Sequence, residues 1–353
     1  MTHSTEPGSG DGATGSVRRT RRRGVRRWAR LLLPAVVLAL LAGGSGLFWL
    51  YTDLNRNIDG VDLEAALGDD RPEKRPLSGK NLLILGSDSR AGANADLGTG
   101  NVSGARSDTA LVLHVPEGGT RAVAVSIPRD TLVSRPECVT PEGTTHPAAD
   151  RVMFNSVYAL VGPSCVVKTV EQLSGVRMDH YLEIDFSGFK EVVDAIGGVS
   201  ITLDVPIEDD ASGLDLEAGT HRLDSTEALA FVRTRHGIGD GSDLGRIELQ
   251  QRFLVAMLSE IKRQDLLGSP TTAYRIADTL TSALTTDSDL ASLGDLAELA
   301  SGMDGIDPAT METITLPVAY DVRDPNRVVP SEPDAGLLWA AIREGGEIPD
   351  SVG

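Results

Sequence analysis

Arginines gather in one short stretch of this chain, "FVRTRHGIGDGSDLGRIELQQ" at residues 231–251. Arg233, Arg235 and Arg246 flank a glycine-rich loop there, although the whole chain carries a formal net charge of -18. Guanidinium groups repel one another, so three of them held in one short segment indicate a bound anion. A solvated charged surface is the competing explanation, and it is the commoner one for any single arginine.

The spacing of these residues predicts how they would face an anion. Residues two apart share a face in an extended segment but not on a helix. Because Gly237, Gly239 and Gly241 follow immediately, we expect the chain to leave its helix near Arg233 and to point Arg233 and Arg235 the same way. Arg246 and Gln250 are four apart at the start of the next expected helix, so they share a face near its positive N-terminal end. Such a set of arginines predicts a pyrophosphate or phosphodiester as the ligand.

Acids and arginines also stand at the ends of three expected strands. The segments "LGSDSR", "ARSDTALVLHV" and "SIPRDT" contribute Asp88, Arg90, Arg106, Asp108, Arg129 and Asp130. An open α/β sheet gathers its site at strand ends, although Asp and Ser are also common turn residues. Mg²⁺ takes one or two carboxylates, water and phosphate oxygens, so carboxylates beside arginines suit a magnesium-dependent phosphoryl site. Asp88 and Asp108 are the predicted metal ligands.

Strand and helix patterns alternate from residue 80 onward. Apolar runs bounded by Gly, Pro and Asp predict strands at 81–87, 109–115, 121–127, 180–186, 199–205 and 311–318. Helical spacing and capping residues predict helices at 148–160, 164–174, 187–198, 224–232, 245–264, 271–284 and 288–302. This interleaving predicts the α/β fold class, with one large domain over residues 80–330 and a short helix and tail at 331–353.

The N-terminal part predicts a membrane anchor. Residues 1–30 hold eight arginines against Glu6 and Asp11, which predicts a disordered cytoplasmic arm. Residues 31–51 contain no charged residue and are long enough, at ~1.5 Å per residue, to span the ~30 Å core of a bilayer. A cleaved signal peptide fits less well, because the apolar run is long and no small-residue cleavage site follows it. We expect a single-pass cell-membrane protein with a stalk at 52–79 and its main domain outside the cell.

Cysteine use and charge agree with this placement. Cys138 and Cys165 are the only cysteines, and in a domain outside the cytoplasm such a pair favours a disulfide over two free thiols. The outer part is strongly acidic, which argues against nucleic-acid binding, because contacts to phosphates need a basic field.

Seven segments, in this order, resemble the LytR-CpsA-Psr family of bacterial cell-envelope proteins. They are "NLLILGSDSR", "RSDTALVLHV", "VSIPRDT", "DHYLEIDFSGF", "VVDAIGGVSI", "LDSTEALAFVRTRH" and "DLGRIELQQ". The resemblance is specific over residues 81 to about 260. It implies an α/β/α sandwich of three layers whose core holds a hydrophobic tunnel for a lipid tail.

Proteins of this family transfer a glycopolymer from a polyprenyl-pyrophosphate carrier to peptidoglycan and release polyprenyl phosphate. The resemblance implies Asp88 and Asp108 as ligands of Mg²⁺, with Mn²⁺ as a possible substitute. It also implies phosphate-binding roles at Arg90, Arg106, Arg129, Arg233, Arg235, Arg246 and Gln250. Asp130 would support its loop, and either Asp108 or Asp130 could serve as a general base.

This chain departs from many family members at Leu249, where they have a second arginine. Contact with the phosphate from this helix would therefore depend on Arg246. Teichoic acid, capsular polysaccharide and arabinogalactan all remain open as the glycopolymer, because no motif encodes the choice. A polyprenyl-pyrophosphate pyrophosphatase would use the same residues, with water replacing the sugar hydroxyl. An envelope regulator that binds DNA is the third alternative, and the Arg-rich arm offers no folded reading element for it.

Overall fold

The computed structural model describes residues 44–45, 48–68, 70–74, 79–87, 107–118, 121–140, 143–235, 243–264, 269–303 and 305–352. The chain divides into two compact units, Met1–Thr52 and Asp53–Gly353. The Arg-rich arm and most of the expected membrane segment lie outside the described residues. Within the described ranges, no helix combines the length and the apolar character needed to cross a membrane.

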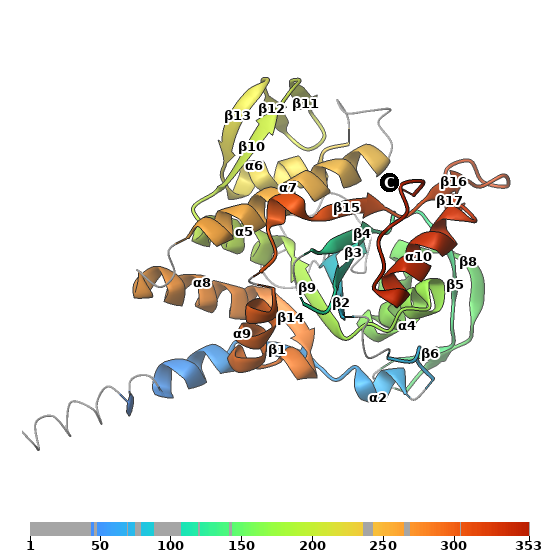
Figure 1. The fold of residues 1–353 in the computed structure, drawn as a ribbon, viewed down its shortest axis with the longest axis horizontal. Coiled ribbons are helices and arrows are strands. Elements are labelled where there is room, and N and C mark those ends of the chain that lie inside the picture. The colour runs from blue at the N-terminus through green and yellow to red at the C-terminus, as the bar shows by residue number, and fades with distance from the viewer. Residues whose placement is uncertain are drawn as a thin grey trace, which may run out of the picture. The chain divides into compact units, whose positions relative to one another are not determined.

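A mixed seven-stranded sheet forms the centre of the second unit (Figure 1). Its strands, in order across the sheet, are β1 (Asp59–Val61), β14 (Leu284–Asp287), β9 (His180–Asp185), β2 (Lys80–Ser87), β3 (Ser107–Val115), β4 (Val123–Ser126) and β15 (Glu312–Thr315). β2 runs parallel to β9, whereas β3 runs antiparallel to both β2 and β4. The carboxyl ends of β2, β9 and β4 therefore meet the amino end of β3 at one edge, which we call the site edge.

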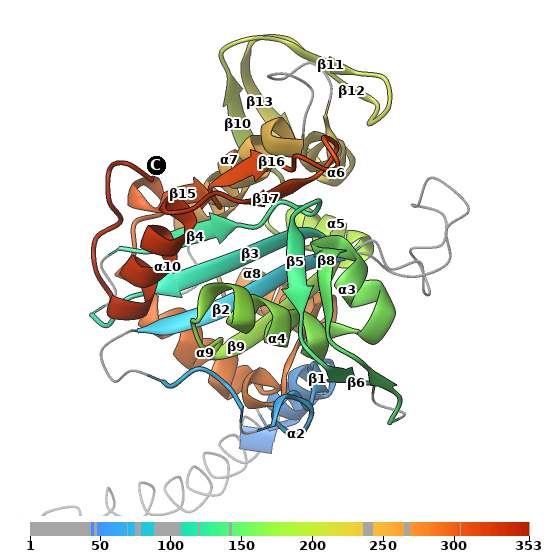
Figure 2. The same cartoon turned by 90° about the vertical axis from the view of Figure 1, so that its right-hand side faces the viewer.

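Helices cover both faces of this sheet. Side chains of a strand alternate between faces, so Leu83 and Leu85 of β2 enter one apolar cluster and Leu82 enters another. The first cluster includes side chains of α3 (Phe154–Val161), α4 (Pro163–Ser174) and α10 (Asp334–Glu344), which lie on one face in Figure 2. The second includes side chains of α7 (Asp243–Arg263) and α9 (Leu293–Gly302). The mixed α/β fold is confirmed.

A third apolar cluster lies beside the sheet and brings together the segments that flank the arginine-rich stretch. It joins α5 (Phe186–Ala195), α6 (Ser225–Arg233), α7 and α8 (Pro270–Ala283) with two small two-stranded sheets. These sheets are β10 (Val199–Leu203) with β13 (Gly219–Leu223), and β11 (Ile207–Asp209) with β12 (Leu214–Leu216). The expected capping box at the start of α6 is present, because Asp224 accepts from the Glu227 amide while the Glu227 side chain accepts from the Asp224 amide.

Three further two-stranded sheets lie outside the main sheet. They are β5 (Leu132–Arg135) with β8 (Ala149–Met153), β6 (Cys138–Val139) with β7 (Thr145–His146), and β16 (Val318–Tyr320) with β17 (Val328–Pro330). β8 differs from the helix expected from residue 148, since the helix α3 begins only at Phe154. Pairing with β5 decides this local structure, and tertiary contacts of this kind override helix propensity.

Part of the segment expected to be a stalk is folded into the second unit. β1 forms the edge of the sheet beside β14, and Leu63, which precedes α2 (Glu64–Leu67), and Leu67, its last residue, are buried in the first apolar cluster. Arg71 donates to the Glu171 carboxylate of α4 at 2.7 Å, and both side chains are buried. The two leucines, four apart and followed by this arginine, give the segment an apolar face and a buried ion pair.

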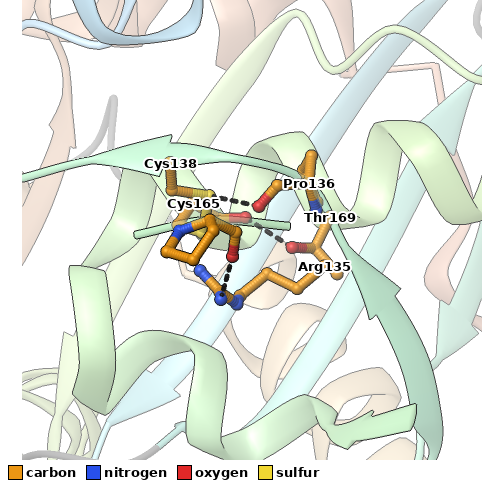
Figure 3. The surroundings of a disulfide bond; sticks show 6 residues. Arg135, Pro136, Cys138, Cys165 and Thr169 are labelled. Carbon is orange, nitrogen blue, oxygen red and sulfur yellow. Dashed lines mark hydrogen bonds between the residues drawn. A yellow bond between two sulfur atoms is a disulfide. The ribbon is translucent and has the colours of Figure 1, made fainter. Parts of the chain in front are cut away.

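The expected disulfide joins Cys138 of β6 to Cys165 in the first turn of α4 (Figure 3). Both cysteines are buried, and Thr169 of the same helix donates to the Cys165 carbonyl at 2.7 Å. Nearby, Arg135 donates to the Pro147 carbonyl at 2.6 Å. The bond fastens the β6–β7 hairpin to the helix that covers the sheet.

Replacing both Cys138 and Cys165 with alanine should lower the free energy of unfolding by about 3 kcal/mol, because the unfolded chain loses a constraint on a loop of 27 residues. Denaturant unfolding with and without a reducing agent measures this loss. The reducing agent should destabilise the parent chain by a similar amount and leave the double variant unchanged. Equal stability of parent and variant would contradict the expectation.

His114 in β3 predicts a pH dependence of stability. Its ring is buried, and Nδ1 lies 2.8 Å from the Asn81 Oδ1 atom. Burial lowers the pKa of His114 below 6.5, although Asp179 opposes this shift. As the pH falls below about 6.5, His114 takes up a proton more readily in the unfolded chain than in the folded chain. Stability is therefore lost as the pH falls from about 7 towards 5. Thermal melts of the parent and a His114→Asn variant should show a shallower decline for the variant, and parallel declines would exclude His114 as the cause.

Candidate functional site

Residues 129–131 begin three positions after the end of β4, at the site edge. Two main-chain hydrogen bonds fix this loop against the start of α3, where the Asn155 amide donates to the Arg129 carbonyl at 3.0 Å and the Phe154 amide donates to the Thr131 carbonyl at 2.9 Å. The side chains of Arg129 and Asp130 are 19% and 22% exposed. The loop therefore presents a guanidinium and a carboxylate from a backbone that is held in place.

The start of α7 brings a carboxylate against two of the expected phosphate-binding arginines. Asp243, the first residue of α7, lies 3.2 Å from Nε of Arg129 and 2.5 Å from an Nη atom of Arg246. The Arg246 side chain is only 3% exposed. A carboxylate is also stabilised at this end of a helix by the exposed amide groups. Asp243 thus joins Arg129 and Arg246, whose α-carbons belong to different elements.

The same pattern continues outward through Asp130. Its two carboxylate oxygens lie 3.6 Å from Nε of Arg129 and 3.3 Å from an Nη atom of Arg327. Arg327 belongs to the loop between β16 and β17. Arg327, Asp130, Arg129, Asp243 and Arg246 therefore form an alternating series of opposite charges, which we call the ion-pair chain. Arg327 also lies 3.9 Å from the Asp324 carboxylate, so each arginine of the ion-pair chain faces at least one acid.

The stretch that contains Arg233 and Arg235 has the predicted backbone. α6 ends at Arg233, and Thr234 is extended, with φ -59° and ψ 135°. Thr234 is fully buried and donates to the Ala230 carbonyl at 2.9 Å. The helical Arg233 and the following Arg235 are therefore separated by one extended residue whose side chain is buried.

Arg233 and Arg235 are held differently. The Arg233 guanidinium lies 4.9 Å from the centre of the Phe186 ring, a cation–π contact at the start of α5. The Arg235 amide donates to the buried Asp209 carboxylate at 2.9 Å, which fixes the backbone there. Among the residues that the structure describes, none forms a hydrogen bond or ion pair with the Arg235 guanidinium. This side chain is available to an anion.

The two glutamines of α7 connect the arginine-rich stretch to the sheet. Gln250 donates to the Val232 carbonyl at 3.0 Å, and Gln251 donates to the Ser126 hydroxyl, also at 3.0 Å. Val232 lies at the end of α6, and Ser126 is the last residue of β4. α7 is thereby bonded both to the end of α6 and to the strand that leads to Arg129. Gln250 lies beside the site.

Several expected site residues lie outside the part of the chain that the structure describes. They are Asp88, Arg90, Arg106 and the side chain of Asp108. Ser87 and Ser107, which flank residues 88–106, are paired in register as the last residue of β2 and the first of β3. Both ends of that segment are therefore anchored at the site edge.

Two tyrosines share one buried carboxylate of β9. Tyr158 of α3 and Tyr181 of β9 donate to the two oxygens of Glu183, at 2.6 and 2.5 Å. Burial raises the pKa of both phenols, and the negative charge of Glu183 raises it further. Both tyrosines stay protonated at neutral pH, which excludes them as general bases.

Two acids and one histidine near these strands have structural roles. Asp185 caps α5 by accepting from the Gly188 amide at 2.8 Å. His180 lies 3.4 Å from Asp287, a buried carboxylate that also accepts from the Tyr181 amide at 2.7 Å. Burial alone would raise the pKa of Asp287, but these hydrogen bonds lower it overall.

Asp243 and Arg327 are site residues that the sequence reasoning missed. Asp243 stands within the arginine-rich stretch, and an acid at the first position of a helix that carries Arg246 three residues later was a usable signal. Arg327 gave no such signal, because it is a lone arginine in a turn, separated from Asp130 by 197 positions.

The chain matches known proteins over most of its length. The sequence model of the LytR_cpsA_psr family matches residues 50–341. A protein of Corynebacterium glutamicum named probable cell wall biosynthesis protein LcpB is 34% identical over 280 residues, which cover 75% of this chain and 61% of the relative. The TagT protein of Bacillus subtilis, named a polyisoprenyl-teichoic acid–peptidoglycan teichoic acid transferase, is 30% identical over 70% of this chain and 74% of its own length. The matches to LcpB and to LcpA of the same organism span only 61% and 44% of those proteins.

Solved structures show the same fold. A LytR-Csp2A-Psr enzyme from Actinomyces oris superposes with a TM-score of 0.59 at 24% identity, covering 81% of this chain and 95% of that one. B. subtilis TagT gives a TM-score of 0.56 at 23% identity over 81% of this chain and 98% of its own. From the match over residues 50–341 and these relatives, this chain belongs to the LytR-CpsA-Psr family.

Proposed function

We propose that this protein transfers a glycopolymer from a polyprenyl-pyrophosphate carrier to peptidoglycan, forming a phosphodiester during cell-wall assembly. Relatives named for teichoic acid transfer to peptidoglycan support this activity, and a solved structure of TagT is described as bound to LIIa-WTA. The glycopolymer that this chain carries is left open by those names. The corynebacterial relatives are named only for cell-wall biosynthesis.

The arrangement of arginines at the site edge carries the proposal. Arg129 and Arg246 meet at Asp243, and Gln250, one turn after Arg246, donates to the carbonyl of Val232, which precedes Arg233 at the end of α6. Guanidinium groups bind phosphate oxygens bidentately, and a pyrophosphate offers enough oxygens for several of them. The chain carries a net charge of -18, yet arginines gather at this edge of the sheet. An anion with two phosphates is the ligand that it fits.

The reaction is an in-line displacement at phosphorus. The hydroxyl oxygen of the acceptor attacks the phosphorus next to the sugar, forming a new P–O bond. The P–O bond to the lipid phosphate breaks, and its electron pair leaves with polyprenyl phosphate. Charge spreads over the equatorial oxygens in the transition state, and the arginines stabilise that charge from fixed positions.

The acceptor proton passes to a carboxylate. Asp108 and Asp130 are the candidates, and each oxygen of Asp130 already faces a guanidinium, Arg129 on one side and Arg327 on the other. Occupied lone pairs make Asp130 better suited to hold Arg129 than to accept a proton. Asp108 would also be occupied as a ligand of Mg²⁺, so neither residue is singled out as the base.

Mg²⁺ is part of this proposal, with Asp88 and Asp108 as the residues that would hold it. Within the described residues there is no cluster of three His, Cys, Asp or Glu side chains. Mg²⁺ does not need one, because it combines one or two carboxylates with water and phosphate oxygens. The buried Ser87 hydroxyl at the site edge has no hydrogen-bond partner among the described residues, so an unsatisfied oxygen is present where the metal is expected. The bound ion would neutralise charge on the phosphates.

We also propose that a single N-terminal membrane helix places the arm in the cytoplasm and the folded domain outside the cell. The uncharged run at 31–51 next to the Arg-rich arm supports this orientation. The Cys138–Cys165 disulfide supports an oxidising compartment for the domain.

Release of polyprenyl phosphate by the full chain in detergent micelles, with and without a peptidoglycan fragment, tests the class of reaction. A transferase should release lipid phosphate rapidly only when the acceptor is present, and EDTA should stop the release until Mg²⁺ is restored. Release at the same rate without acceptor would identify a pyrophosphatase. No release under either condition would exclude both activities.

A further inference from the structure

The β16–β17 hairpin packs directly on the loop that carries Arg129. The Val328 amide donates to the Asp130 carbonyl at 3.4 Å, and Thr131 and Val328 form an isolated parallel bridge. The Arg327 side chain, one residue earlier, donates to the Asp130 carboxylate at 3.3 Å. The hairpin therefore contacts both the main chain and the side chain of Asp130.

The turn that carries Arg327 is itself rigidly built. The buried Asp321 carboxylate accepts from the Arg323 and Asp324 amides at 3.1 and 2.8 Å, and from an Nη atom of Arg151 at 2.7 Å. The hydrogen bond from Arg151 lowers the pKa of Asp321, so the carboxylate stays ionised at neutral pH. Arg151 lies in β8, which runs into α3, the helix that also holds the Arg129 loop.

These contacts give Arg129 a defined position. Its Nε atom lies between two carboxylates, 3.6 Å from Asp130 and 3.2 Å from Asp243. Asp243 is set by α7, whereas the Asp130 side chain is fixed from its far side by Arg327. Without Arg327, one oxygen of Asp130 loses the guanidinium that it faces, and the carboxylate can turn on its Cα–Cβ bond.

We propose that Arg327 is a positioning residue that acts through Asp130 to hold the Arg129 guanidinium in place for the reacting phosphate. The functional half of this inference rests on the proposed transfer reaction. The structural half, that Arg327 controls Arg129 through Asp130, is a property of the protein itself. The competing explanation is that Arg327 only fastens the hairpin to the domain.

Arginine NMR of the full chain in detergent micelles tests the structural half without any substrate. The Nε–H signal of Arg129, identified by its loss in Arg129→Lys, should shift in Arg327→Ala and in Asp130→Asn. Arg323→Ala is the matched control, because Arg323 is an exposed arginine in the same turn and only its amide is bonded to Asp321. An Arg129 signal that stays in place in Arg327→Ala overturns the proposal.

Steady-state kinetics test the functional half. Arg327→Ala should lower kcat about 10- to 100-fold with little change in the KM for the acceptor, because a displaced guanidinium fails mainly in the transition state. Arg327→Lys should recover part of this loss, and Arg323→Ala should show none. Because both residues act through one carboxylate, Arg327→Ala combined with Asp130→Asn should be no slower than Asp130→Asn alone.

The outcomes separate the two claims. Additive losses in the double variant, or a loss in Arg327→Ala that a matching fall in the unfolding midpoint explains, would overturn the positioning role. If the parent chain makes no transfer product, the proposed function fails, and the Arg129 signal still decides whether Arg327 controls Arg129.

Discussion

Asp243→Ala should lower the free energy of unfolding by about 3 kcal/mol, one of the two largest effects that we expect. The substitution removes the carboxylate that lies 3.2 Å from Arg129 and 2.5 Å from Arg246. Arg246 is 3% exposed, and removal of one partner from a buried ion pair costs far more than the pair itself contributes. Transfer activity should be lost as well, because both guanidiniums lose a carboxylate that orients them.

Urea unfolding of the Asp243→Ala chain measures this effect, and Glu248→Ala is its matched control. Glu248 lies on the same helix and pairs with Arg252 at 2.9 Å, but both side chains are about half exposed. An exposed pair of this kind contributes about 0.5 kcal/mol or less. Similar small losses in the two variants would show that Asp243 is not a buried counter-charge.

Arg235→Ala should lower kcat by about 10²- to 10³-fold while leaving the free energy of unfolding unchanged within about 0.5 kcal/mol. The backbone contact to Asp209 survives the substitution, since it involves the amide of residue 235. The guanidinium has no hydrogen bond or ion pair within the described ranges, so we expect its removal to cost little stability. Its expected partner is the pyrophosphate of the carrier.

Arg121→Ala controls for the loss of one arginine in the kinetic measurement. Arg121 is exposed, pairs with Glu312 at 3.2 Å, and precedes β4 at the sheet edge opposite the site. Its activity should equal that of the parent chain. Unchanged turnover in Arg235→Ala, or an equal loss in Arg121→Ala, would remove Arg235 from the phosphate site.

Local sequence patterns predicted much of the fold. Apolar runs bounded by turn residues predicted β2, β3 and β4, because a strand that is buried on both faces is a nearly continuous apolar run in the sequence. The capping residues predicted the start of α6, and the arginine-rich stretch predicted that the helix ends near Arg233. Each of these signals lies within a few residues of the element that it specifies.

Elements and contacts that depend on partners far away in the sequence could not be predicted from local patterns. Residues 149–153 form a strand because β5 pairs with them, and the folded part of the expected stalk depends on Glu171 and the sheet. In the site, Asp243 could have been found from its position at a helix start. Arg327 could not, since its importance comes from a contact with Asp130 that only the folded chain creates.

Mass spectrometry of the transfer product tests the central claim most directly. The full chain in detergent micelles, with Mg²⁺, a synthetic polyprenyl-pyrophosphoryl sugar and a peptidoglycan fragment, should form a sugar-phosphate-peptidoglycan adduct and release polyprenyl phosphate. Arg121→Ala should form the same adduct, and Arg235→Ala should form almost none. Release of sugar phosphate and lipid phosphate without an adduct, or an adduct that forms equally well in Arg235→Ala, would contradict a transferase that works through this arginine site.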